Sequence, residues 1–192
     1  MTKAGRRVSM TVTFLEMNAR PCAPPPPQPA GKVAILRSEN PPAHFYLYLY
    51  DVIGAEYLWV DRKKLTRPAL TEIIQDPRNI LYVLYTEGTP AGMAELDLRK
   101  EGAINISYFG LVPELAGRGH GRWLMGQALA LAWTKDVARV WVHTCTLDHP
   151  SALGFYRAQG FTAFARAVET FPDPRLTGQL PRGAAPQIPI LG

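Results

Sequence analysis

The stretch AINISYFGLVPELAGRGHGRW, residues 103–123, decides the fold of this chain. Its first half is rich in β-branched and aromatic side chains, which predicts a strand over 103–112. Gly117, Gly119 and Gly121 then make a turn. Beyond the turn, apolar residues at helical spacing predict a helix over 119–135: Leu124, Ala128, Leu131 and Ala132.

A glycine-rich turn at the start of a helix is typical of an anion site. The first N–H groups of a helix have no partner within it and carry the positive end of its dipole. Glycines let the backbone approach a ligand closely, because no Cβ intervenes. The turn therefore predicts a site for phosphate or pyrophosphate, to which Arg118 and Arg122 could add charge. An ordinary strand-to-helix connection is the alternative interpretation.

Two other nucleotide motifs fit this turn poorly. A Walker loop requires Gly-Lys followed by Ser or Thr, but Arg122 and Trp123 follow the last glycine. A dinucleotide-binding fingerprint requires two residues before its last glycine and an acid at the end of the next strand. That strand ends here in Cys145-Thr146, although Asp148 lies nearby.

The chain after the turn completes a crossover. Residues 138–144 are predicted as a strand, and residues 150–159 as a short helix with Pro150 at its first position and Gly160 as its stop. A strand, a helix and a second strand in this order form a right-handed crossover, so strands 103–112 and 138–144 should run parallel. Residues 161–171 should return as the last strands.

The chain before the turn predicts an antiparallel meander. Strands 80–85, 91–98 and 103–112 are joined by Glu87-Gly88 and Glu101-Gly102, connections too short for a parallel crossover. A short helix over 66–75 precedes the meander, and further strands are expected at 11–17 and 32–37.

Residues 45–50 are ambiguous, because their alternating pattern favours a strand while their setting favours a helix. They follow Asn40-Pro41 and precede Gly54, so we predict a helix with Asn40 as its N-cap. The expected fold class is α+β, or mixed α/β: a mixed, mostly antiparallel sheet flanked by helices.

The expected organisation has three parts. Residues 1–31 form an N-terminal segment in which Pro24–Pro27 make a rigid surface connector. Residues 32–175 form the domain, and residues 176–192, rich in proline and glycine, form a peripheral or poorly ordered tail.

Composition narrows the class of protein. The formal charge is +5, but Lys and Arg are scattered and no recognition motif accompanies them, so an anionic small ligand explains the charge at least as well as nucleic acid does. Cys22 and Cys145 are expected to be reduced thiols. No metal-ligand pattern, membrane-spanning run or signal peptide is recognisable, so we expect a cytoplasmic protein without a metal.

Two motifs in order resemble the GNAT superfamily of N-acetyltransferases. The first is Ala116–Gly121, where the family has Gln or Arg, two variable residues, Gly, a variable residue, and Gly or Ala. The second is His149–Tyr156 with the closing Gly160-Phe161. Ala116, His149 and Asn105 depart from the family pattern. The resemblance covers about residues 32–175 and is firmest over 103–161. Within the family, the chain resembles a group of bacterial proteins.

The resemblance implies a sheet opened between its two parallel central strands, with acetyl-CoA in the gap as acetyl donor. It implies direct attack by an amine acceptor on the thioester, through a ternary complex. In this chain the implied cofactor-binding residues are Leu111, Val112, Gly117, Arg118, Gly119, His120, Gly121, Arg122 and His149.

The resemblance also implies roles in catalysis. The N–H of Leu111 or Val112 would stabilise the oxyanion, and Tyr156 would act as the acid. We place Glu95 ahead of His143 as the base. Aromatic candidates for the acceptor wall, which are equally candidates for the core, are Tyr46, Tyr50, Tyr57 and Trp59.

Other functions remain open at this point. A non-catalytic acyl-CoA-binding sensor would share the cofactor motif. Acetylation of a protein terminus rather than of a small amine would share the whole site, and a homodimer is possible.

Overall fold

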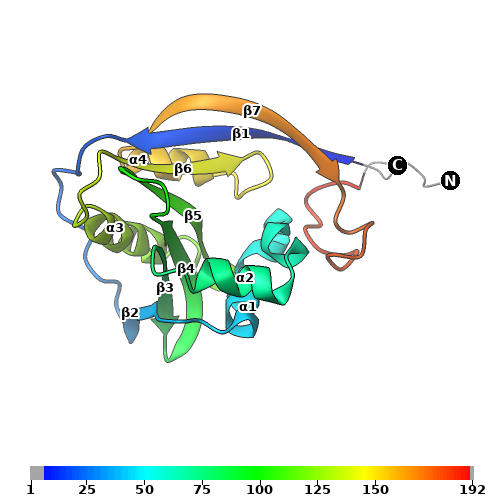
Figure 1. The fold of residues 1–192 in the computed structure, drawn as a ribbon, viewed down its shortest axis with the longest axis horizontal. Helices are drawn as coiled ribbons and strands as arrows, with labels where there is room; N and C mark the ends of the chain where they lie inside the picture. The colour runs from blue at the N-terminus through cyan, green and yellow to red at the C-terminus, as the bar shows by residue number, and fades with distance from the viewer. Residues whose placement is uncertain (1–6, 191–192) are drawn as a thin grey trace.

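The computed structural model describes residues 7–190 and shows a single mixed sheet flanked by helices (Figure 1). The sheet order is β2-β3-β4-β5-β6-β1-β7, and only β5 and β6 run parallel. The expected α+β fold class is thereby confirmed. The strands are β1 Arg7–Met17, β2 Val33–Ser38, β3 Asn79–Thr86, β4 Thr89–Asp97, β5 Ala103–Leu111, β6 Arg139–Cys145 and β7 Thr162–Pro172. The α-helices are α1 Ala43–Gly54, α2 Arg67–Ile74, α3 His120–Ala132 and α4 Ala152–Ala158.

Two apolar cores cover the two faces of the sheet. On one face, Leu84 and Ala94 pack with Leu124 of α3 and Tyr156 of α4. On the other face, α1 and α2 cover alternate residues of β3 and β4, including Leu81, Val83 and Met93. Successive side chains along β3 and β4 point to opposite faces of the sheet, so each strand contributes to both cores. This explains why β3 and β4 are apolar on both faces.

The predicted meander is confirmed. Strands β3, β4 and β5 pair antiparallel in sequence order. Glu87 and Gly88 form the first turn with φ values of 49° and 82°, the left-handed conformation that a two-residue hairpin with the correct twist requires.

The predicted crossover is also confirmed, and its pairing is short. Strands β5 and β6 pair in parallel from Ala103↔Arg139 to Ile106↔Val142. Beyond Ile106 the two strands separate, while β5 continues to Leu111 and β6 to Cys145. The sheet is therefore open at its centre, beyond Ile106, at the end of β5 that leads into the glycine turn.

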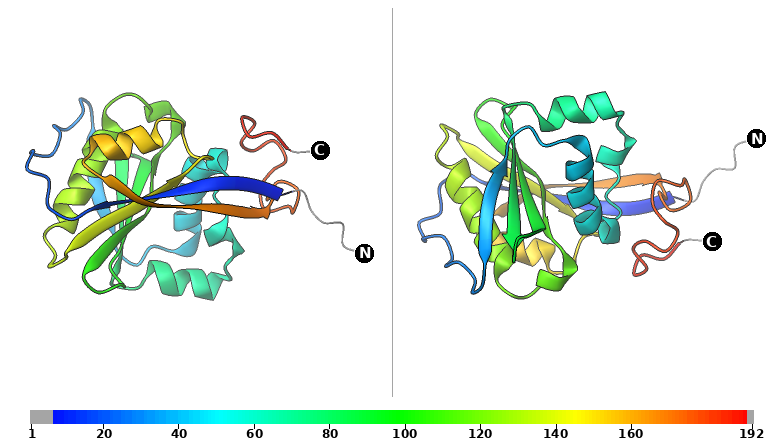
Figure 2. Two further views of the ribbon diagram at one scale, coloured as in Figure 1. Left: turned by 90° about the horizontal axis from the view of Figure 1, so that it is seen from above. Right: turned by 90° about the horizontal axis from the view of Figure 1, so that it is seen from below.

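The N-terminal strand corrects the expected domain boundary at residue 32. Strand β1 lies between β6 and β7 and pairs antiparallel with both, so the sheet includes residues 7–17 (Figure 1). Figure 2 shows β1 and β7 extending side by side past the other strands. The pattern predicted a strand here but carried no information about its partners, which lie more than a hundred residues away.

The proline-rich connector packs along the outside of α3. A Cβ added at Gly126 would lie 2.5 Å from Cδ of Pro26, so the connector rests directly on the helix at this glycine. Most of the prolines remain exposed. The connector thus links β1 to β2 across one face of the molecule.

Two helix starts differ from those expected. The segment 45–50 is helical as predicted, but Asn40 does not cap α1: it has φ 49°, and Pro42 occupies the N-cap with its carbonyl accepting from the N–H of Tyr46. Helix α4 begins at Ala152 rather than at Pro150. The His149 side chain accepts from the N–H of Ser151 in the preceding turn, so that turn is structured without being helical.

The C-terminal segment is packed, which corrects the expected peripheral tail. Arg175 is 5% exposed, and its guanidinium donates to the carbonyls of Ala184, Ala185 and Ile188. Leu180 and Ala185 are buried in a small core with Leu58 and Val60. The residue spacing in the sequence did not predict that the Arg175 guanidinium donates hydrogen bonds to three backbone carbonyls. Within residues 7–190, no helix has the length and apolar character needed to cross a membrane.

Candidate active site

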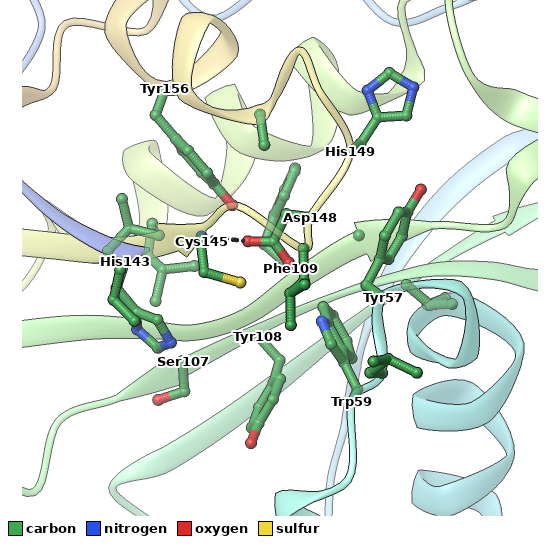
Figure 3. A pocket seen from close by; sticks show the side chains of 18 of the residues that line it. Tyr57, Trp59, Ser107, Tyr108, Phe109, His143, Cys145, Asp148, His149 and Tyr156 are labelled. Atoms are coloured by element: carbon green, nitrogen blue, oxygen red, sulfur yellow. Dashed lines mark hydrogen bonds between the residues drawn. The ribbon is translucent and has the colours of Figure 1, made fainter. Parts of the chain in front are cut away.

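A cavity of about 630 Å³ occupies the opening between β5 and β6 (Figure 3). One wall comes from the end of β5, the glycine turn and α4. Its far wall comes from residues 57–61 and the outer ends of β1 and β7. A concave, largely apolar pocket with a few polar groups is the usual form of a small-molecule site.

Hydrogen bonding along β5 decides which backbone amide faces this cavity. The N–H of Val112 donates to the carbonyl of Ala91 at 2.9 Å, so the prediction that Val112 could serve as the oxyanion donor is wrong. Leu111 lies opposite Gly92 in the same ladder. Since polar groups alternate in direction along an antiparallel strand, the N–H of Leu111 points away from β4 and into the opening.

The glycine turn lies at the edge of the cavity. Gly117 and Gly119 have φ values of 73° and 83°, and Gly119 is the N-cap of α3. Both φ values are unfavourable for residues with a side chain, which explains the glycines at these positions. Gly117 and Gly121 line the cavity, so the free amides at the start of α3 lie beside it.

The other residues of the turn lie away from the cavity. Arg118 and Arg122 are exposed and do not line it, and His120 is 8% exposed with Nδ1 lacking a hydrogen-bond partner. The predicted cofactor-binding residue His120 is therefore largely buried and does not line the cavity. His149 does line the cavity, with its ring Nδ1 at 2.8 Å from Oγ of Ser151.

Tyr156 presents its hydroxyl to the cavity from α4 (Figure 3). Its ring is held edge-on by Phe109, Phe155 and Phe161, with centroid separations of 6.4, 5.4 and 6.1 Å. Burial, and next the charge of Asp148, raises the pKa of the Tyr156 phenol well above its usual value. The hydroxyl is therefore protonated at neutral pH and available as a donor.

Asp148 is the residue that sequence reasoning passed over. Its Oδ2 accepts from Oγ1 of Thr144 and from the N–H of Cys145, both at 2.8 Å. Burial, and next Asp148, raises the pKa of the Cys145 thiol to about 11, so this thiol is neutral and a poor nucleophile. The sequence feature that could have identified Asp148 is its position directly before His149, just after the end of β6.

Glu95 lies outside the cavity, which contradicts its predicted role as the base. It is 0% exposed, forms an ion pair with Arg62, and accepts a hydrogen bond from the hydroxyl of Tyr46. Nε of Arg62 also donates to the Tyr46 hydroxyl at 3.2 Å. A carboxylate held in this way has a structural role. His143, the second candidate, lies on β6 with its ring exposed at the cavity.

The aromatic candidates separate into two groups. Tyr46 is fully buried and belongs to the core. Tyr50 is buried in the same core and also borders the cavity. Tyr57 and Trp59 line the cavity, and Trp59 packs against Tyr108 with ring centroids 5.1 Å apart. Among residues 7–190, no group of three or more His, Cys, Asp or Glu side chains could hold a metal ion.

Comparison with known proteins identifies the architecture. The sequence pattern of the acetyltransferase (GNAT) family matches residues 46–161. An aminoglycoside acetyltransferase from an uncultured soil metagenomic sample superposes with a TM-score of 0.57 and 18% identity, covering 71% of this chain and 93% of that one. No curated protein matches the sequence.

Two longer proteins share the fold over part of their length. A conserved Staphylococcus epidermidis protein of unknown function gives a TM-score of 0.57 and 14% identity, with coverage of 87% of this chain and 63% of that one. A GCN5-related N-acetyltransferase from Sphaerobacter thermophilus gives 0.59 and 18%, with coverage of 87% and 53%. This chain therefore spans less than two thirds of these two relatives.

Replacing Glu95 tests its structural role. Glu95→Ala leaves the Arg62 guanidinium buried and unpaired, which should lower the free energy of unfolding by about 3–5 kcal/mol. Urea denaturation followed by circular dichroism measures the change. The control is Glu39→Ala, in an exposed pair with Arg37, which should change stability by less than about 0.5 kcal/mol. Equal stability of the two variants would contradict the assignment.

Proposed function

Because the chain belongs to the acetyltransferase (GNAT) family, we propose that it transfers an acetyl group from acetyl-CoA to a primary amine through a ternary complex. The observation that carries the proposal is the convergence of three groups on one cavity. These are the N–H of Leu111, which points away from β4, the glycine turn at Gly117–Gly121, and the protonated hydroxyl of Tyr156.

The glycine turn suits the pyrophosphate of acetyl-CoA. A Cβ at Gly117 or Gly119 would meet no atom within 4 Å, so space is open beside both residues. Free amides at the start of α3 and the positive end of its dipole favour an anion there. The apolar surface of Leu111 and Phe155 continues from the turn into the cavity, where the remainder of the molecule would lie.

The reaction proceeds by attack of the neutral amine nitrogen on the thioester carbonyl carbon. The N–H of Leu111 donates to the oxyanion as the tetrahedral state forms. The C–S bond then breaks, Tyr156 donates its proton to the leaving sulfur, and the amine proton passes to a cavity base and finally restores the phenol. With Glu95 removed from consideration, Asp148 and His143 are the proton acceptors that the cavity offers.

Direct attack is favoured over an acyl-enzyme. Cys145 is the cysteine that lines the cavity, but burial and the neighbouring Asp148 keep its thiol protonated. A neutral thiol attacks a thioester poorly. The amine therefore meets the thioester without a covalent intermediate on the protein.

Replacing Tyr156 by Phe tests the proposed acid. The variant keeps the ring and its aromatic contacts but loses the proton, so kcat should fall by about 100-fold while the Kd for acetyl-CoA changes little. Turnover is measured as thiol release with an amine panel, and Kd by calorimetry. Tyr48→Phe, on the exposed side of α1, is the matched control.

Three results would count against the proposal. An unchanged kcat in Tyr156→Phe would remove Tyr156 as the acid. Absence of acetyl-CoA binding would contradict the whole assignment. Binding of acetyl-CoA without thiol release for any amine would identify a non-catalytic acyl-CoA-binding protein instead.

A further inference from the structure

The end of the cavity at Tyr57, Trp59 and Tyr108 is aromatic (Figure 3). These three rings are half-buried, and three further half-buried rings also line the cavity: Phe14, Trp141 and Phe171. Such a wall favours an apolar or aromatic ligand by burial and by ring stacking.

Lys64 offsets part of the negative charge that Asp61 and Glu169 place at the cavity. Asp61 is ion-paired with Lys64 at 2.8 Å, and the Lys64 ammonium also lies over the Phe171 ring at 5.9 Å. Glu169 is an exposed carboxylate on β7. A polyamine or aminoglycoside carries several ammonium groups, each of which would need a carboxylate partner on desolvation.

Asp148 supplies a single negative charge where the reaction must occur. Its Oδ2 is held by two donors, and among residues 7–190 no hydrogen bond to Oδ1 is found. Figure 3 shows the Tyr156 hydroxyl directed toward Asp148, with the ring of Tyr57 on the other side of the cavity. Burial raises the pKa of both phenols, with smaller contributions from Asp148 and, for Tyr57, Glu56. An ammonium group placed here would satisfy the free oxygen of Asp148.

We propose that the acceptor is a primary amine carrying one aromatic or comparably apolar group, with its ammonium on Asp148 and its apolar group against Tyr57, Trp59 and Tyr108. This inference rests on the proposed function, and it names the substrate class. The bound ammonium passes one proton to Asp148 or His143, and from there to water, before the amine attacks. The C–S bond then breaks, and the products are the N-acetyl amide, CoA thiol and one released proton.

The test compares amines in an acetyl-CoA assay that reads thiol release. Phenethylamine and tryptamine should exceed spermidine, kanamycin and a polar tripeptide by at least tenfold in kcat/KM. Asp148→Asn retains an oxygen for Thr144 and Cys145 but loses the charge, and it should raise the KM for phenethylamine at least tenfold. Tyr57→Ala should raise it similarly, whereas Tyr48→Ala should not.

A second measurement separates this proposal from the proposed function. Tryptophan fluorescence follows amine binding to the chain saturated with CoA, without turnover. Selective binding of phenethylamine over spermidine supports the proposed substrate class even if no thiol is released. The absence of thiol release would overturn the proposed catalytic function instead. Preference for spermidine or kanamycin, or unchanged binding in Asp148→Asn, would overturn the proposal while leaving acetyl transfer intact.

A different observation concerns the C-terminal segment. Asp76-Pro-Arg78 and Asp173-Pro-Arg175 have the same sequence and the same local hydrogen bonds, with the arginine N–H and Nε donating to one carboxylate oxygen and Nη2 to the other. The Arg78 side chain is 62% exposed, whereas that of Arg175 is 2% exposed. The two Asp-Pro-Arg copies thus differ in burial, and Asp97 and Arg99 form the same hydrogen bonds without the proline.

The buried copy is connected to the cavity wall. Arg175 uses Nη1 to bind three carbonyls of residues 184–188, at 3.3, 3.1 and 2.7 Å. Gln187 of that segment donates to the carbonyl of Glu56. Leu180 and Ala185 pack with Leu58 and Val60, both of which line the cavity. The C-terminal segment therefore supports the far wall from behind.

The geometry assigns Arg175 as a positioning residue for the acceptor wall. Leu58 has φ 57°, a conformation that a residue with a branched side chain adopts only when its surroundings hold it. Loss of the Arg175 contacts frees residues 184–188 and, through them, the segment 56–60. Acceptor binding should weaken, while the acetyl-CoA side of the cavity keeps its structure.

Arg175→Ala and Arg78→Ala are matched variants for this test. Arg175→Ala should raise the acceptor KM at least tenfold with an unchanged Kd for acetyl-CoA, and Arg78→Ala should change neither. Should Arg175→Ala fail to fold, Gln187→Ala, an exposed side chain bonded to Glu56, should show a smaller rise in KM alone. The assignment would be overturned if Arg175→Ala had the same acceptor KM as Arg78→Ala. If Arg175→Ala does not fold, an unchanged acceptor KM in Gln187→Ala would overturn it. An equal loss of acetyl-CoA affinity would overturn it as well.

Discussion

The separation of β5 and β6 after Ile106 is the constraint on which the site depends. Parallel pairing stops there, yet both strands continue, so β5 carries amides that no neighbouring strand satisfies. The ladder with β4 directs the N–H of Leu111, rather than that of Val112, into the opening. The same separation makes room for Tyr156 and Asp148 to approach from α4 and from the end of β6. A fully paired sheet would close this space and leave no cavity to bind a substrate.

Both ends of the chain contribute to the far side of this opening. The match to the acetyltransferase (GNAT) family covers residues 46–161, which include the glycine turn, β5, β6 and α4. Strand β1 precedes that region, and β7 and the segment after it follow it. Phe14 and Phe171 reach the cavity from these outer strands. The parts that would hold acetyl-CoA thus lie within the family match, whereas the acceptor end draws on sequence outside it.

Local pattern predicted the elements well, because turn chemistry and periodicity are local properties. The hairpin at Glu87-Gly88 and the helix at α3 followed from a few adjacent residues. Three features needed information from distant parts of the chain. Arg62 and Tyr46 hold Glu95 outside the cavity. The N–H of Val112 donates to Ala91 and so does not face the cavity, and Arg175 holds the C-terminal segment. Burial and register determine these outcomes, and neither can be read from spacing.

A ¹H–¹⁵N spectrum of the protein titrated with acetyl-CoA tests most directly whether acetyl-CoA lies between β5 and β6. The amide resonance of Leu111 should move strongly, because this N–H faces the opening in which the thioester would lie. The resonances of Gly117, Gly119 and Gly121 should move with it. The amide of Val112, bonded to Ala91, should move much less. A titration that shifts Val112 but not Leu111, or that shifts none of these resonances, would contradict the proposed position of acetyl-CoA between β5 and β6.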